Sequence, residues 1–198
     1  MKIKLIGDSI LAYMPKGKLI GSEERFAIEN AETALLRQLY PNYKDVETDV
    51  NVFCLGINDY FRQYYDEDFK KLTTEEIISG LTDFLGEIKK DKNGELVVLS
   101  LLPIRQVYPW SSHYSLISQE IPLVNLGLQA YCEQNKINYV DAYSHFADSN
   151  GVMREDLSSD GIHPNQVGGY DILINLINEE LKKVKSKYSE SSENGFEK

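Results

Sequence analysis

Long apolar runs and an excess of positive charge are both missing from this 198-residue chain. It has no stretch of about 18 apolar residues, as a membrane-spanning helix would need. The opening residues, MKIKLIGDS, have too short an apolar run for a secretory signal, so we expect a cytoplasmic protein. The formal net charge of −10 would repel nucleic acid and anionic membranes, so we expect neither as a partner.

Cysteine and histidine are scarce. The two cysteines, Cys54 and Cys132, lack C-x-x-C spacing, which indicates packed thiols in a reducing compartment. The three histidines lack the close spacing of a zinc site, and we expect neither a metal nor an organic cofactor. The sequence also has no G-x-G-x-x-G segment and no P-loop, which argues against a nucleotide-binding domain of flavodoxin-like architecture.

The composition and length are those of one folded domain. Hydrophobic residues make up 42% of the chain and charged residues 26%, which excludes collagen-like and wholly disordered proteins. Residues 1–185 are long enough for one substantial core, and we assign them to a single domain. Residues 186–198 are rich in Ser, Glu, Lys and Asn, and we expect them to form a flexible polar tail.

Strand and helix patterns alternate along the domain. Apolar runs bounded by Gly, Asn or Pro predict strands at residues 2–6, 26–28, 50–55, 95–102 and 137–140. Apolar periodicity and capping signals predict helices at residues 33–40, 73–88 and 121–132, and a last helix that begins at Pro164. This alternation predicts a three-layer α/β/α fold with a flavodoxin-like parallel five-stranded sheet of order 2-1-3-4-5. Functional loops should then lie at the carboxyl ends of the strands.

A nucleophile candidate follows the first predicted strand directly. In Gly7-Asp8-Ser9, the serine would stand on a sharp turn with its hydroxyl at the edge of the sheet. If the next residues open a helix, the backbone N–H of Ser9 points toward any oxyanion formed there. A turn without any chemistry would give the same tripeptide.

A serine needs a base, and His163 is the histidine best placed to act as one. Pro164 disfavours a helical conformation at His163, so the imidazole should project from a fixed loop. Asp160 stands three residues earlier with Gly161 between them, and its carboxylate can turn back to the imidazole and fix the tautomer. An Asp-Gly turn that caps the last helix would explain the same residues equally well.

Gly56-Ile57-Asn58-Asp59 ends the third predicted strand, at the edge where Ser9 would lie if the two strands are neighbours. The side-chain amide of Asn58 can donate a hydrogen bond where negative charge develops in acyl transfer. Losing one such donor raises the barrier by about 3 kcal/mol. A structural strand-end turn is the alternative explanation for this segment.

The three segments occur together in one order, and in this they resemble the SGNH/GDSL hydrolase family over residues 2 to roughly 182. The resemblance implies a carboxylic ester hydrolase that works through an acyl-enzyme. It also implies that Ser9 is the nucleophile, His163 its base and Asp160 the partner of that base, with Ser9 and Asn58 contributing to the oxyanion hole.

One block departs from the family pattern. The family places a glycine after the second strand, and its N–H completes the oxyanion hole, but this chain has no glycine between Gly21 and Gly56. The best counterpart is Ala31, in Asn30-Ala31-Glu32-Thr33, which retains an N–H. We therefore expect Ala31 to be the third oxyanion donor.

Aromatic residues gather in the segments that follow the third and fourth predicted strands, at residues 60–65 and 104–110. Flat rings with polar tips suit a sugar face, and the resemblance includes members that remove acetyl groups from carbohydrates, so we expect a small-molecule or carbohydrate acetyl ester as substrate. Packing of the rings against the sheet is the alternative. The candidate substrate-binding residues are Ile10, Tyr60, Arg105, Tyr108, Trp110 and Ile162.

Other activities stay open on the sequence. An acyl thioesterase or a lysophospholipase would use the same nucleophile, although no long apolar groove is visible. A non-catalytic, carbohydrate-binding relative is also compatible, with the missing glycine marking a degenerate oxyanion hole. Labelling of Ser9 by a fluorophosphonate separates an enzyme from such a binder.

Overall fold

Five parallel strands form a single sheet in the computed structural model, which describes residues 1–65, 70–91, 94–108 and 112–193. The strand order is β2-β1-β3-β4-β5, as the sequence predicts. All four neighbouring pairs are parallel, so the strands end at the same edge of the sheet. The strands are β1 (Lys2–Gly7), β2 (Ser22–Ala27), β3 (Val50–Cys54), β4 (Glu95–Leu99) and β5 (Asn138–Val140).

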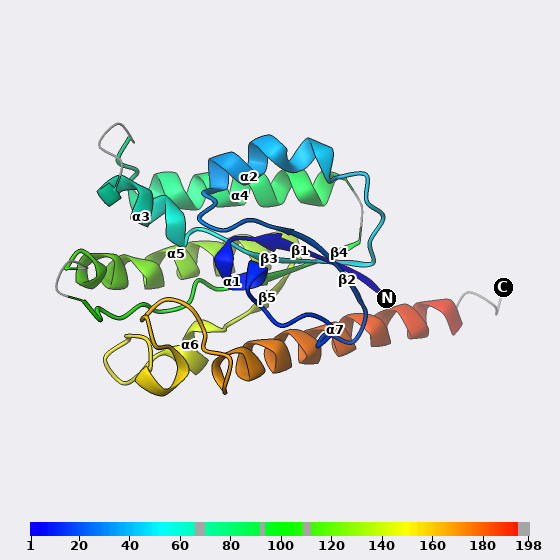
Figure 1. The fold of residues 1–198 in the computed structure, drawn as a ribbon. Helices are drawn as coiled ribbons and strands as arrows, with labels where there is room; N and C mark the ends of the chain where they lie inside the picture. Colours follow the sequence, from blue (N-terminus) through cyan, green and yellow to red (C-terminus); the bar gives the residue numbers. More distant parts are fainter. Residues whose placement is uncertain (66–69, 92–93, 109–111, 194–198) are drawn as a thin grey trace.

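Helices cover both faces of the sheet, as Figure 1 shows with α2 and α4 on one side and α7 on the other. One face packs against α2 (Thr33–Leu39), α4 (Thr74–Lys90) and α5 (Tyr114–Asn135). The other face packs against α1 (Ser9–Ala12), α6 (Tyr143–Phe146) and α7 (Gly169–Glu193). Successive strand residues point to opposite faces, so each central strand supplies both cores. The predicted three-layer α/β/α fold is confirmed.

Helix α4 begins at the capping box that the sequence predicts. The Thr73 hydroxyl accepts the Glu76 N–H at 3.2 Å, and the Glu76 carboxylate accepts the Thr73 N–H at 2.9 Å. Such a cap stabilises a helix by about 1 kcal/mol. The predicted apolar face is buried against the sheet and consists of Ile77, Leu81, Phe84, Leu85 and Ile88.

Strand β2 and helix α5 are longer than predicted, in both cases at the amino-terminal end. β2 starts at Ser22 because its charged residues lie on an edge strand, where polar side chains are tolerated. α5 starts at Tyr114 and continues through Pro122. Burial of Tyr114 and Ile117 on the core side of α5 offsets the roughly 3 kcal/mol that an internal proline costs a helix.

The prediction that the last helix begins at Pro164 is wrong. α7 begins at Gly169, because Gly168 has a φ of +97° and Asn165 closes a turn before the helix. The Asn165 side chain accepts the Gly169 N–H at 3.0 Å. At its other end α7 continues to Glu193, so the first part of the predicted polar tail is helical.

The remaining described elements are α3 (Ile57–Tyr65), which follows β3, and short 3-10 turns at Tyr40–Asn42 and Glu155–Leu157. Within the described ranges, no helix combines the length and the apolar composition that crossing a bilayer requires.

Candidate active site

Ser9 is the first residue of α1 and lies directly beyond the carboxyl end of β1. Gly7 is required there because a Cβ would lie 2.1 Å from the Cys54 carbonyl oxygen of the neighbouring strand. Asp8 caps the helix, and its Oδ1 accepts the Ile10 N–H at 3.0 Å. The backbone N–H of Ser9 makes no hydrogen bond to any residue that the structure describes. Gly7 and Asp8 thus shape the turn, and the N–H of Ser9 remains available for a ligand.

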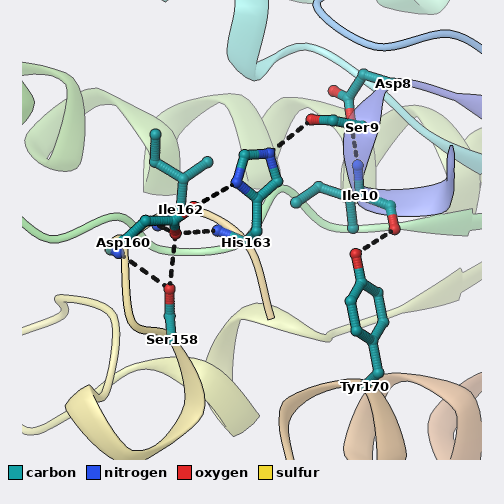
Figure 2. A network of polar contacts seen from close by, with 9 residues as sticks. Asp8, Ser9, Ile10, Ser158, Asp160, Ile162, His163 and Tyr170 are labelled. Atoms are coloured by element: carbon teal, nitrogen blue, oxygen red, sulfur yellow. Dashed lines mark hydrogen bonds and ion pairs between the residues drawn. The ribbon is translucent and has the colours of Figure 1, made fainter. Parts of the chain in front are cut away.

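The structure brings Ser9, His163 and Asp160 into one chain of hydrogen bonds, with the imidazole in the middle (Figure 2). His163 Nδ1 lies 2.7 Å from Asp160 Oδ2, and His163 Nε2 lies 2.9 Å from Ser9 Oγ. An ionised carboxylate only accepts hydrogen bonds, so the proton of a neutral imidazole belongs on Nδ1. Nε2 is then the acceptor that faces the serine hydroxyl.

Asp160 is held in its ionised form by the loop around it. Its Oδ1 accepts the backbone N–H groups of Ile162 at 2.9 Å and His163 at 2.8 Å, and the hydroxyl of Ser158 at 3.1 Å. Burial acts to raise the pKa of Asp160, but the hydrogen bonds from the His163 side chain and from these N–H groups outweigh it and hold the pKa well below its usual value. The His163 imidazole therefore faces a charged carboxylate throughout the neutral range.

Arg105 holds this loop in place, and its predicted contact with substrate stays a prediction. Its backbone N–H donates to the Gly161 carbonyl at 2.8 Å, and its Nη2 donates to the Ser158 carbonyl at 3.1 Å. Gly161 has a φ of +83°, and a Cβ there would lie 2.1 Å from the Arg105 oxygen. Only glycine fits this close approach, which explains the Asp-Gly pair before His163.

Asn58 lies in α3 (Ile57–Tyr65), just beyond the end of β3, and β3 is the neighbour of β1. Its Nδ2 donates to the Ala31 carbonyl at 3.1 Å. A side-chain amide has two N–H groups, so this bond orients Asn58 and leaves the second N–H available for an oxyanion.

Ala31 has a different role from the predicted one. Its N–H donates to the Ile28 carbonyl at 3.2 Å and closes a turn in which Asn30 has a φ of +56°. The N–H expected to serve as an oxyanion donor is thus already engaged. The Ala31 carbonyl, in contrast, accepts a hydrogen bond from Asn58 and so orients the Asn58 side chain.

Asp59 is a site residue that the sequence analysis did not identify. Its buried carboxylate accepts the Thr33 hydroxyl at 2.8 Å and the Thr33 N–H at 3.2 Å, which ties the start of α2 to α3. Burial raises the pKa of Asp59 to about 6, although the hydrogen bonds from Thr33 act to lower it. This tie keeps the Ala31 segment beside Asn58.

The aromatic segment after β3 is the helix α3, so the prediction that it forms a loop is wrong, although two of its residues, Phe61 and Arg62, do line a pocket. Tyr60 is 3% exposed, and its hydroxyl lies 3.3 Å from the Thr74 hydroxyl, so the ring packs rather than binds. Tyr108 is exposed after β4, and Trp110 lies outside the described residues.

A pocket of about 330 Å³ opens beside Asn58, a size suited to a small ligand. Its lining residues are Asn30, Asn58, Phe61, Arg62, Tyr114 and Ile162.

A second, much smaller cavity lies beside the Ser9 turn. Its free volume of about 10 Å³ is about the space that one water molecule needs. Two predicted substrate-binding residues, Ile10 and Ile162, line it, and Ile162 also borders the larger pocket. The other lining residues are Asp8, Cys54, Leu55, Ile57, Leu101, Leu102 and Ile104.

The other two histidines differ in their distance from this site. His113 stacks on Tyr64 with ring centroids 4.5 Å apart, and its ring also packs against Phe61 and Tyr114, which line the larger pocket. His145 lies in α6 on the surface. In the described part of the chain, no three His, Cys, Asp or Glu side chains gather in a way that could hold a metal ion.

Solved structures of other proteins share this fold. A GDSL-like lipase from Bacteroides thetaiotaomicron superposes with a TM-score of 0.78 at 20% identity, over 92% of this chain and 88% of that chain. The acetylxylan esterase Axe2 from Geobacillus stearothermophilus superposes with a TM-score of 0.66 at 20% identity, over 90% of this chain and 93% of that chain. No curated protein matches the sequence. Residues 5–169 match the GDSL-like Lipase/Acylhydrolase family, and the chain belongs to that family.

Proposed function

We propose that this protein is a serine esterase that hydrolyses short-chain acyl esters, with acetyl esters of carbohydrates as its substrates. The observation that carries the proposal is the hydrogen-bonded chain from Ser9 through His163 to Asp160. A serine hydroxyl within 2.9 Å of an imidazole nitrogen is placed for proton transfer.

In the proposed reaction, Ser9 Oγ attacks the ester carbonyl carbon while His163 Nε2 takes the hydroxyl proton. Asp160 holds the tautomer and stabilises the imidazolium that forms. The free N–H of Ser9 and the second N–H of Asn58 donate to the oxyanion. His163 then passes the proton to the departing alcohol. Water, activated by the same imidazole, releases the acid and restores Ser9.

The small cavity beside Ser9 supports a short acyl group. Apart from Asp8 its lining residues are apolar, and its free space is small, which favours the shortest acyl groups. A fatty acyl chain would need several of the buried lining residues to move, because protein interiors are close-packed.

The larger pocket supports a polar, ring-sized alcohol. It combines the aromatic residues Phe61 and Tyr114 with the polar side chains of Asn30 and Arg62. Aromatic surface next to hydrogen-bonding groups is the combination that binds sugars, whose rings have apolar faces and polar edges. The similarity in fold to an acetylxylan esterase agrees with a carbohydrate alcohol.

Turnover across a panel of acetylated sugars, short aryl esters and acyl thioesters tests the proposal. We expect hydrolysis of p-nitrophenyl acetate and faster turnover of acetylated sugars, and we expect Ser9→Ala, His163→Ala and Asp160→Ala each to lose activity sharply while staying folded. Preference for acyl thioesters would redirect the assignment to a thioesterase. An unchanged rate in Ser9→Ala would overturn the mechanism.

A further inference from the structure

Helix α1, which carries Ser9, has only four residues. An isolated helix of this length is unstable in water, because nucleation outweighs the few hydrogen bonds that it forms. Contacts with the rest of the fold must therefore set the position of Ser9. Asp8 supplies one at the start of α1, and the Tyr170 hydroxyl supplies another by donating to the Ile10 carbonyl at 3.1 Å (Figure 2).

The far end of α1 is held by a single side chain from β2. The two N–H groups of Arg25 Nη1 serve three carbonyl oxygens, one N–H being shared: those of Leu11 at 3.0 Å, Ala12 at 3.2 Å and Met14 at 2.7 Å. A guanidinium at the carboxyl end of a helix offers donors and positive charge where unpaired carbonyls converge. The Arg25 side chain is only 14% exposed, so water could replace these donors only in part.

Glu23, two residues earlier on β2, fixes the direction of the guanidinium. Its Oε2 accepts Arg25 Nη2 at 2.8 Å, and its Oε1 accepts the backbone N–H groups of Gly17 at 3.1 Å and Leu19 at 3.3 Å. Glu23 and Arg25 thus attach the segment between α1 and β2 to the edge strand β2 through hydrogen bonds.

The segment held by Arg25 touches both members of the Ser–His pair. It begins with Ser9, and it includes Tyr13, whose ring lies against the imidazole of His163 with centroids 5.2 Å apart. A shift of the backbone at residues 11–14 would therefore move the nucleophile and the packing surface of the base together.

We propose that Arg25 is a positioning residue, which sets the geometry of the Ser9–His163 pair through the backbone of α1. The proposal rests on the proposed esterase function. Arginine is specific here because its fork presents several donors in fixed directions, whereas the lysine ammonium is a point charge on a flexible stem.

The test compares Arg25→Met and Arg25→Lys with Arg37→Met. Arg37 is a matched control because it pairs with Glu87 and Asp83 on α4, in the layer that covers the opposite face of the sheet. A misplacement of about 1 Å can lower a rate by about 100-fold, so we expect kcat of Arg25→Met to fall by about 10- to 100-fold with KM little changed. Arg25→Lys should recover part of kcat, and Arg37→Met should keep all of it.

A crystal structure of Arg25→Lys gives a readout that does not depend on turnover. We expect the distance from Ser9 Oγ to His163 Nε2 to exceed its present 2.9 Å. The melting temperature should fall more in Arg25→Met than in Arg37→Met, because the Arg25 side chain is 14% exposed and that of Arg37 is 39% exposed. A wild type without esterase activity would defeat the proposed function, and the distance would still decide the role of Arg25. An unchanged distance, or a kcat that falls equally in the Arg37 control, would overturn the positioning role.

Discussion

His163 Nε2 lies 2.9 Å from Ser9 Oγ, although the two residues are 154 positions apart in the chain. Ser9 comes from the turn after β1, and His163 comes from the loop before α7. Each side is fixed by its own contacts: Asp8 caps the serine turn, and Asp160 and Arg105 hold the histidine loop. Mutations on the two sides should therefore affect the reaction in distinguishable ways.

Asp160→Asn should lower kcat by about 10²- to 10⁴-fold, because an amide no longer fixes the imidazole tautomer. Steady-state kinetics with p-nitrophenyl acetate measures the change. Asp148→Asn is a matched control, because the Asp148 carboxylate also accepts two loop N–H groups, those of Asn150 and Val152, away from Ser9. A comparable fall in kcat in both variants would mean that Asp160 only supports the loop.

Asn58→Ala should lower kcat by about 10²- to 10³-fold and leave KM nearly unchanged, because an oxyanion forms only along the reaction path. The Ala31 carbonyl also loses its partner, so thermal stability should fall slightly. Parallel measurement of kcat, KM and melting temperature separates the two effects. A rise in KM at constant kcat would place Asn58 in ground-state binding instead.

Asp8→Asn should make the protein less sensitive to alkaline pH. Burial raises the pKa of Asp8 to about 7, so its contribution to stability is complete below the unfolded pKa of about 4 and is lost as pH rises through 7. An asparagine oxygen can still accept the Ile10 N–H. In guanidinium denaturation, the free energy of unfolding should fall between pH 5 and pH 8 in the wild type by on the order of 2 kcal/mol more than in Asp8→Asn. Equal losses in both proteins would contradict the burial argument.

Ile104→Val should broaden the range of acyl groups, because it removes one methyl group from the wall of the small cavity. We expect the ratio of kcat/KM for p-nitrophenyl propionate to that for the acetate to rise by roughly 10-fold, as one methylene is worth about 1–3 kcal/mol of discrimination. Ile88→Val, on the buried face of α4, controls for the stability lost with a buried methyl group. The same ratio in both variants would show that the acyl group binds elsewhere.

The sheet and the order of the site segments could be predicted from the sequence, because buried parallel strands give apolar runs and their ends carry the polar motifs. Val50–Cys54 is fully buried and is followed at once by the Gly-x-Asn-Asp segment. The contact between Asp160 and His163 is local, three residues apart, so a turn could be foreseen.

The remaining features depend on contacts between distant segments. The sequence does not show that Arg105 reaches the Ser158 carbonyl, 53 residues away, or that the Ala31 N–H is engaged in a turn. The sequence analysis predicted a loop where α3 lies. A cluster of aromatic residues is typical of a binding loop as well as of a buried helix face, and the sequence does not show which rings are buried. The pocket beside Asn58 is lined by Phe61, from the predicted segment, and by Tyr114, and these two residues come together only when α3 and α5 pack.

Reaction with a fluorophosphonate, followed by peptide mapping, tests most directly whether Ser9 is a nucleophile activated by His163. The account predicts a single adduct on Ser9 in the wild type and a much slower reaction in a folded His163→Ala variant. An adduct on another residue, or equal labelling rates in the two proteins, would contradict it.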